Sequence, residues 1–251
     1  MSASCVVPPP APSTPPASPI PSATASVAFP TIIPSATWTS EPLPSPTADL
    51  REGLGPTLLR DTFDDPSPWA LSTSPSSGAG IRDGRLTLAI RAPRVYHFTR
   101  RLPPGATDFY AEIDVFTEVC SPGDEFGLMV RNNSLGEHYR FVIGCDGTAR
   151  ISRALETGSR ALTLWTASPA VIPGAPSINR LGVWANGLDL KLLVNGTEVI
   201  AARDSALAQG SFGVVARAGP AGQVAVSFDN LIVRGLRDPR ASPTAAPTPP
   251  P

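Results

Sequence analysis

NRLGVWANGLDLKLLVNGTEVI, residues 179–200, contains two Asn-Gly pairs, each flanked by alternating apolar and polar residues. Asn-Gly is the strongest two-residue hairpin signal, because a type I′ turn needs φ > 0 at both central positions. The stretch therefore predicts a three-stranded antiparallel meander with turns at 186–187 and 195–196.

Two-residue loops at both turns would also fix the register of the meander. The expected partners are Ala185 with Leu188, Val183 with Leu190, Leu181 with Leu192, Val194 with Thr197, and Leu192 with Val199. These apolar partners share one face, which we expect to be buried. The opposite face would carry Gly182, Trp184, Asp189, Lys191, Leu193 and Glu198.

Prolines divide the 251-residue chain, because most of its 31 prolines lie near the two ends. Residues 1–55 and 238–251 are rich in Pro, Ser, Thr and Ala, with too few large apolar groups to offset the entropy of ordering. We expect both segments to be disordered spacers. Residues 56–237 have the length and apolar content of a single domain with its own core.

The charge and the apolar runs exclude some partners. The formal net charge of −1 provides no basic stripe for phosphates, which argues against a nucleic-acid partner. No apolar run reaches the 18 residues that a membrane-spanning helix needs. The oligomeric state is left open.

Short strand-like segments recur at regular intervals through residues 56–237, separated by Gly, Pro and Asp-Gly turn signals. The nearest candidate for a helix is 204–209, and it would make one turn at most. This pattern predicts an all-β fold, an antiparallel two-sheet jelly-roll sandwich.

Three consecutive segments, 109–119, 126–131 and 138–143, suggest a further up-down meander. Alternation along them would place Glu112, Asp114, Phe116, Glu118, Arg131, His138 and Arg140 on one non-core face. Cross-strand ion pairing on a solvated surface accounts for such a mixture without any ligand.

Cys120 and Cys145 each end one of these segments, so both would lie at the same edge of the meander. With one strand between them they would be about 10 Å apart, at ~4.8 Å per strand, which is too far for a disulfide unless the loop 120–124 closes the gap. We expect a disulfide, which is typical of an extracytoplasmic compartment. The alternative is two buried thiols.

Several pieces, taken together and in this order, resemble the concanavalin A-like lectin/glucanase jelly roll, above all its laminin G-like and 3-keto-disaccharide hydrolase-like members. The pieces are LRDTFDD (59–65) with Trp69, DGRLTL (83–88), GLMVR (127–131) with HYRF (138–141), Asp146-Gly147, NRLGV (179–183) with VNG (194–196), and VSFDNLIVR (226–234). The resemblance implies the fold of nearly all of 57–236. It leaves function open, because this superfamily includes lectins, glycosidases and adhesion modules.

The glucanase branch carries its catalytic carboxylates on one strand, as Glu-x-Asp-x-Glu or Glu-x-Asp-x-x-Glu. Here Glu112 and Asp114 fit, but the third position holds Phe116 or Thr117. At ~3.3 Å per residue Glu118 lies about 20 Å from Glu112, whereas glycosidases need a carboxylate pair within roughly 5–9.5 Å. Glu112 and Asp114, about 6.6 Å apart by the same rise, remain a possible pair, but with Asp114 in the supporting role of that branch no acid/base partner is left. We therefore favour a non-catalytic protein and keep this pair as the alternative. With only two histidines, a Ser-His-Asp arrangement or a zinc site is also improbable.

A binding module would stack aromatic side chains on sugar rings. Trp184 is the best candidate, beside Asp189, and Phe116 and Arg131 are similar candidates on the other meander. The alternative for Trp184 is a structural role under a loop. The resemblance also implies a structural Ca²⁺ site, held by Asp229 of the last strand and backbone oxygens of an early turn at Gly84. The alternative is that Asp229 bonds backbone amides at the edge of the sandwich.

Ser2-Ala3-Ser4-Cys5, followed by a Pro-rich tract, resembles the cleavage site of a bacterial lipoprotein, although Ser2 stands where that pattern has an apolar residue. The resemblance implies lipidation of Cys5; the alternative is an incidental cysteine in a tail. The expected protein is a non-catalytic extracytoplasmic module that binds glycan or another surface partner and meets the membrane only through such an anchor. The rivals are a glycoside-cleaving enzyme and a structural spacer domain.

Overall fold

The computed structural model describes residues 54–237. Cys5 and both Pro-rich segments lie outside these residues, so the lipidation site stays a prediction. The described part is all-β and contains no helix, and therefore none that could cross a membrane. The one-turn helix considered at 204–209 does not form; this segment is a loop.

Fifteen strands build the domain. The first eight are β1 Leu54–Asp61, β2 Ser77–Arg82, β3 Arg85–Ile90, β4 Tyr96–Arg100, β5 Phe109–Val119, β6 Glu125–Asn132, β7 His138–Gly144 and β8 Thr148–Leu155. The remaining strands are β9 Gly158–Ala161, β10 Thr166–Ala167, β11 Ser177–Asn186, β12 Asp189–Val194, β13 Thr197–Arg203, β14 Ser211–Arg217 and β15 Val224–Leu236.

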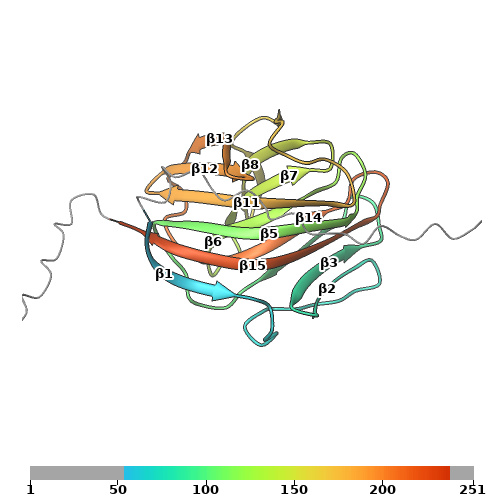
Figure 1. Ribbon diagram of the computed structural model, residues 1–251, viewed down its shortest axis with the longest axis horizontal. Helices are drawn as coiled ribbons and strands as arrows, with labels where there is room; N and C mark the ends of the chain where they lie inside the picture. Colours follow the sequence, from blue (N-terminus) through green and yellow to red (C-terminus); the bar gives the residue numbers. More distant parts are fainter. Residues whose placement is uncertain (1–53, 238–251) are drawn as a thin grey trace, which may run out of the picture. The chain divides into compact units, whose positions relative to one another are not determined.

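The strands form two antiparallel sheets (Figure 1). The eight-stranded sheet, here called sheet A, has the order β13-β12-β11-β5-β15-β3-β2, with β1 also paired to β15. The seven-stranded sheet, called sheet B, has the order β10-β8-β7-β6-β14-β4, with β9 paired to β8. The two-sheet jelly roll expected from the sequence is confirmed.

The main core lies between the two sheets. Alternate residues of β5, β11, β12 and β15 on one side meet those of β6, β7, β8 and β14 on the other. Phe109 of sheet A and Phe212 of sheet B, for example, form an edge-to-face pair with ring centroids 4.9 Å apart. Both rings are almost completely buried, so this pair joins the sheets through apolar contact rather than hydrogen bonds.

The predicted meander at 179–200 is present as β11, β12 and β13, and its faces are as expected, but its register differs. Ala185 pairs with Leu190 rather than Leu188, because the first turn is centred on Gly187 and Leu188. Only Gly187 has a positive φ there, +56°, as a type II′ turn with Gly first requires. The shift is two residues, and an even shift leaves every side chain on its predicted face.

The second turn forms at Asn195 and Gly196, both with positive φ, and pairs Val194 with Thr197 as predicted. A bulge between Leu192 and Leu193 then moves the partner of Leu192 from Val199 to Ile200. Bulges insert one residue on one strand and cannot be read from alternation alone.

The expected meander of 109–143 is wrong in one respect. β5 belongs to sheet A, whereas β6 and β7 belong to sheet B. Alternation sorts core residues from outer ones correctly along these strands except at Arg131, but it does not say which sheet a strand joins. The outer residues of β5 and those of β6 and β7 therefore lie on opposite surfaces of the sandwich.

The disulfide between Cys120 and Cys145 is confirmed, with 6.0 Å between the Cα atoms. Because β5 ends in sheet A and β7 ends in sheet B, the bond links the two sheets at one end of the sandwich. No strand has to be spanned, so the distance problem raised by a single meander does not arise.

We expect the double substitution Cys120→Ser with Cys145→Ser to lower the free energy of unfolding. The two half-cystines are 25 residues apart in sequence, and a loop of that size corresponds to a stabilisation of about 3.5 kcal/mol at 25 °C in the chain-entropy model. Urea unfolding of both proteins under the same conditions measures the difference. A change below about 1 kcal/mol would show that this link does not contribute as argued.

Candidate functional site

Trp184 lies on the outer face of sheet A, as the sequence predicts. It is half-buried and lines a groove of about 440 Å³ over β11, β12 and β13. The groove is also lined by Asn186, Asp189, Leu190, Lys191, Ala201, Ala202 and Arg203. The structure thus brings Trp184 and Asp189 together in one hollow.

The charged groups of this groove already have partners. Arg203 Nε lies 2.9 Å from Asp189 Oδ1, and Lys191 Nζ lies 2.8 Å from a carboxylate oxygen of Glu198. Trp184 itself packs against Tyr110, with ring centroids 6.4 Å apart, within a small outer cluster. Part of the indole is therefore used for packing, which agrees in part with the structural role considered above.

Phe116 and Arg131 do not share a surface. Phe116 lies on the outer face of sheet A, where the guanidinium of Arg85 stacks over its ring at 3.8 Å. Arg131, in sheet B, is 0% exposed. The expectation that Arg131 faces outward is wrong, and its side chain is not available to a ligand.

A strand irregularity explains why alternation fails at Arg131. The pairing of β14 with β6 shifts between Ser211 and Gly213, and Arg131 has a positive φ of 52°. Bulges of this kind redirect a side chain relative to its neighbours.

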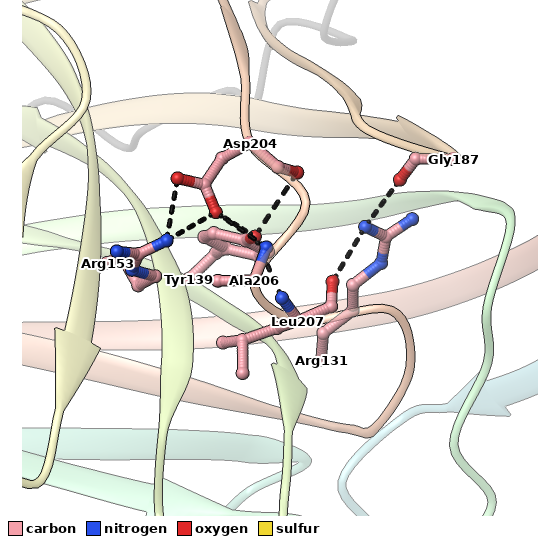
Figure 2. Close-up of polar contacts among 7 residues, drawn as sticks. All are labelled: Arg131, Tyr139, Arg153, Gly187, Asp204, Ala206 and Leu207. Atoms are coloured by element: carbon pink, nitrogen blue, oxygen red, sulfur yellow. Dashed lines mark hydrogen bonds and ion pairs between the residues drawn. The ribbon is translucent and has the colours of Figure 1, made fainter.

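The guanidinium of Arg131 donates four hydrogen bonds to three backbone carbonyls, of which those of Gly187 and Leu207 are drawn in Figure 2. Nη1 donates to Gly187 O at 2.8 Å and to Leu207 O at 3.0 Å, and Nε and Nη2 both donate to Thr107 O. Burial lowers the pKa of Arg131 from its usual value, yet arginine stays charged at pH 7. One cation thus connects three separate loops.

Asp204, which lies near Arg131 in Figure 2, is the acceptor of a second group of hydrogen bonds. It accepts hydrogen bonds from the hydroxyl of Tyr139 at 2.6 Å, from Arg153 Nη1 at 2.6 Å and from the amide of Ala206. Burial raises the pKa of Asp204, but these hydrogen bonds outweigh burial and lower it overall. The segment 204–209 is held as a loop by these bonds instead of forming a helical turn.

The outer face of sheet B carries a set of residues that the sequence analysis did not single out. Tyr96 and Phe98 of edge strand β4 are 42% and 51% exposed, and Trp165, beside β10 at the opposite edge, is 40% exposed. No other aromatic side chain in residues 54–237 is as exposed as these three.

Arginines lie between these aromatic rings. The guanidinium carbons of Arg140 and Arg217 lie 5.0 and 5.3 Å from the centroid of Tyr96, and that of Arg150 lies 4.3 Å from the centroid of Trp165. Cation–π contacts of this kind favour a guanidinium position over the face of a ring.

Glu125 links Tyr96 to Arg150, and through Arg150 to Trp165. Its carboxylate accepts a hydrogen bond of 2.6 Å from the hydroxyl of Tyr96 and one of 3.0 Å from Arg150 Nη2. Burial and the contact with Glu125 raise the pKa of Tyr96, so the phenol stays neutral. Burial lowers the pKa of His138 on the same face, so its imidazole adds no charge at pH 7.

An apolar floor and a hollow complete this surface. Met129, Val142 and Val215 form a cluster separate from the main core on the outer side of β6, β7 and β14. A hollow of about 510 Å³ opens beside Tyr96 and Phe98, between β4 and the loop that follows β6. We call the surface formed by Tyr96, Phe98, Glu125, Arg140, Arg150, Trp165 and Arg217 the aromatic–arginine face.

The carboxylates of β5 lie on the other side of the sandwich and are engaged with neighbours. Arg180 Nε is 2.7 Å from Asp114 Oδ1 and 3.6 Å from Glu112 Oε1. Asp114 also accepts from Asn230 at 3.1 Å, and Glu118 accepts from a serine hydroxyl at 2.6 Å. The three carboxylates are thus held in a structural network, with one arginine near Glu112 and Asp114 and a neutral hydroxyl on Glu118.

Asp229 and Gly84, the expected calcium residues, both lie next to Asp64. Gly84 has a φ of +69° in the turn between β2 and β3, where Asp64 Oδ1 and the carbonyl oxygen of Thr62 are within 4 Å of its ideal Cβ position. Burial, followed by the negative charges of Asp114 and Asp64, raises the pKa of Asp229. In the described residues, no group of three or more His, Cys, Asp or Glu side chains could hold a metal ion, so a cation here would need backbone oxygens as well.

No protein-family model matches the chain, and no curated protein matches its sequence. Solved structures do match. The carbohydrate-binding module CBM66 from Bacillus subtilis has a TM-score of 0.55 at 16% identity, over 67% of this chain and 96% of that module. A Bacillus subtilis protein of unknown function with a galectin-like fold has a TM-score of 0.55 at 16% identity, over 73% of this chain and 97% of its own.

The catalytic domain of an endo-1,3-beta-glucanase (laminarinase) from Thermotoga petrophila also matches, with a TM-score of 0.53 at 10% identity, over 74% of this chain and 100% of that domain. At these identities the likeness establishes the fold alone, and it agrees with the jelly roll that the sequence predicts. The matched structures include both a binding module and a catalytic domain, so the fold alone does not separate the two activities.

We expect Arg131→Met to lower the free energy of unfolding by about 2 kcal/mol or more, because it removes the donors of carbonyl groups in three loops, one of them buried. Arg131→Lys should recover only part of the loss, since an ammonium cannot reproduce the planar fork.

The matched control is Arg60→Met, on an exposed position of β1, which should change stability by no more than about 0.5 kcal/mol. Chemical denaturation of the three variants measures these differences. Equal effects of the substitutions at 131 and 60 would contradict the structural role of Arg131.

Proposed function

We propose that the protein is a non-catalytic carbohydrate-binding module that binds glycan on the aromatic–arginine face of sheet B. The observation that carries the proposal is the grouping of Tyr96, Phe98 and Trp165, the three most exposed aromatic side chains of the described residues, around this one face. Exposed aromatic side chains gathered on one surface are uncommon on a protein that has no ligand there.

The chemistry of this face suits a sugar polymer. Aromatic faces can cover the apolar C–H side of a pyranose ring, and guanidinium groups can donate to several hydroxyl oxygens at once. Tyr96 and Phe98 lie on one edge of sheet B and Trp165 lies at the other, so a ligand touching both edges would cross several strands. Strands lie about 4.8 Å apart, which gives room for several sugar units in a row.

Hydrolysis is the weaker alternative. A glycosidase needs two carboxyl groups about 5–9.5 Å apart, one of them able to donate a proton. On the aromatic–arginine face the only carboxylate is Glu125, which is bound to Tyr96 and Arg150. Glu112 and Asp114 lie close to one arginine on the other sheet. Neither arrangement supports an acid/base pair.

The groove beside Trp184 is a second candidate place for the same activity. It combines an indole with Asn186, Asp189 and Lys191, the combination expected from the sequence. Its charges are paired with each other, and its indole packs on Tyr110. These contacts leave fewer free donors than on sheet B, so we rank this groove second.

We also propose an extracytoplasmic location. The disulfide between Cys120 and Cys145 supports it, because such bonds persist in oxidising compartments. A glycan-binding module would meet extracellular polymers there.

We expect substitution of the aromatic side chains of sheet B to weaken glycan binding without unfolding the protein. Phe98→Ala and Trp165→Ala remove exposed rings and should each weaken binding by roughly tenfold or more, using about 1.4 kcal/mol per factor of ten. Trp184→Ala, on sheet A, should leave the affinity within about threefold. A glycan array followed by calorimetry with the best ligand measures all four proteins.

A parallel assay of reducing-sugar release tests the enzymatic alternative. Turnover by the wild type that disappears in Glu112→Gln would overturn the non-catalytic proposal. Loss of binding in Trp184→Ala alone would move the site to sheet A.

We further propose that Asp229, with the turn at Gly84, holds a structural Ca²⁺. Without calcium the raised pKa of Asp229 means that ionisation costs stability as the pH rises through that pKa. In the presence of a chelator at pH 7, Asp229→Asn should therefore unfold at a higher temperature than the wild type. The difference should vanish near pH 3, where the aspartic acid of the wild type and the asparagine of the variant are both neutral.

Calcium should raise the melting temperature of the wild type and not that of Asp229→Asn. At 100 times Kd the expected stabilisation is about 2.7 kcal/mol, or roughly 5–10 °C for a domain of this size. Differential scanning calorimetry with and without a chelator measures the shift. A wild type that melts at the same temperature in both would exclude the site.

A further inference from the structure

The aromatic–arginine face has more positive than negative charge. Arg140, Arg150 and Arg217 each lie over one of its rings, and within residues 54–237 Glu125 is the only carboxylate that contacts any of these arginines, through Arg150. Among residues 54–237, neither Arg140 nor Arg217 forms an ion pair. Two guanidinium charges therefore lack a protein counter-ion on this face.

The guanidinium groups of Arg140 and Arg150 are only partly used by the protein. Arg140 is 8% exposed, and its Nη2 donates to a serine hydroxyl at 3.0 Å, whereas Arg150 Nη2 donates to Glu125 at the same distance. The Nε atoms of both side chains are covered by protein atoms and have no hydrogen-bond partner. An anionic oxygen would therefore have to contact the Nη atoms of these arginines, where it would form a charge-assisted hydrogen bond.

The arginines are also held in place before any ligand arrives. Tyr96 lies beneath two of them, and its hydroxyl is fixed by a hydrogen bond to Glu125. Trp165 lies beside the third. A side chain that is already ordered loses less entropy on binding, so these contacts favour recognition by the guanidinium groups.

General attraction of polyanions does not explain such an arrangement. The chain has a formal net charge of −1, so its overall field does not draw acidic polymers. The excess positive charge is local, and it coincides with the exposed rings of Phe98 and Trp165.

We propose that the aromatic–arginine face recognises an acidic polysaccharide, in which the rings cover sugar faces and Arg140 and Arg217 bind an anionic substituent, a carboxylate or a sulfate. This inference rests on the proposed glycan binding and adds the class of sugar. Arginine suits both substituents, because its planar fork can donate two parallel hydrogen bonds to paired oxygens.

The test compares pairs of polymers that share a sugar backbone and differ in whether an anionic group is present. Polygalacturonate is compared with its fully methyl-esterified form for the carboxylate, and dextran sulfate with dextran for the sulfate, by calorimetry at 50 mM and 500 mM NaCl. We expect one acidic polymer to bind at least tenfold more tightly than its neutral counterpart and to weaken at the higher salt concentration, as charge-assisted contacts do. The pair that shows the difference identifies the substituent.

Variants of the two arginines then test whether these side chains bind the anionic substituent. Arg140→Gln and Arg217→Gln should each reduce the preference for the acidic polymer about tenfold, whereas Arg60→Gln, an equal charge change on an exposed position of sheet A, should not. Arg217 is only half-buried, so its variant keeps the test valid if Arg140→Gln unfolds. Melting temperatures of all variants are measured alongside.

The outcomes separate the two proposals. Equal binding of acidic and neutral polymers, lost in Phe98→Ala, would overturn the acidic preference and leave glycan binding intact. Acidic binding that is reduced equally by substitution at residue 60 would show general attraction of polyanions and overturn the recognition by this face. No binding of any polymer by the wild type would overturn both.

Discussion

One buried cation, the guanidinium of Arg131, connects parts of the chain that are far apart in sequence. Its four hydrogen bonds reach Thr107 before β5, Gly187 in the β11–β12 turn and Leu207 before β14. Burial of a charge is unfavourable unless strong acceptors surround it. These carbonyls therefore have to stay in place around Arg131, and the loops of both sheets are fixed at this end of the sandwich.

The disulfide between Cys120 and Cys145 joins the sheets through strands β5 and β7. With the loops held by Arg131 and the sheets linked in this way, the two outer faces can differ in chemistry without affecting the core. Sheet A uses its outer charges in structural ion pairs, such as that of Arg180 with Asp114. Sheet B has exposed aromatic rings and arginines such as Arg140 that lack a counter-ion. This contrast is why we place binding on sheet B.

Much of this architecture follows from local patterns in the sequence. The Asn-Gly pairs located the meander of β11 to β13, and alternation assigned Trp184 and its neighbours to the correct face. Alternation could not show that β5 and β6 belong to different sheets, because both possibilities bury the same side chains. It also failed at Arg131, where an irregular strand turns the side chain inward.

The aromatic–arginine face was missed for a related reason. Tyr96 and Phe98 alternate with His97 on one short strand, so their common outward direction could have been noted. Trp165, however, lies outside any strand in a loop, and only folding brings it close to Arg150. Residues that come together from several strands and a loop leave no periodic signal.

The location of the binding face is tested most directly by the indole N–H signals of the protein in ¹H–¹⁵N NMR spectra. The chain has four tryptophans, of which Trp165 lies at sheet B and Trp184 on sheet A. Titration with a short fragment of the acidic polymer that binds, trigalacturonate for a carboxylate or sulfated isomaltotriose for a sulfate, should shift the signal of Trp165 progressively and leave that of Trp184 in place. A shift confined to Trp184, or no shift of either signal at saturating sugar, would contradict the account.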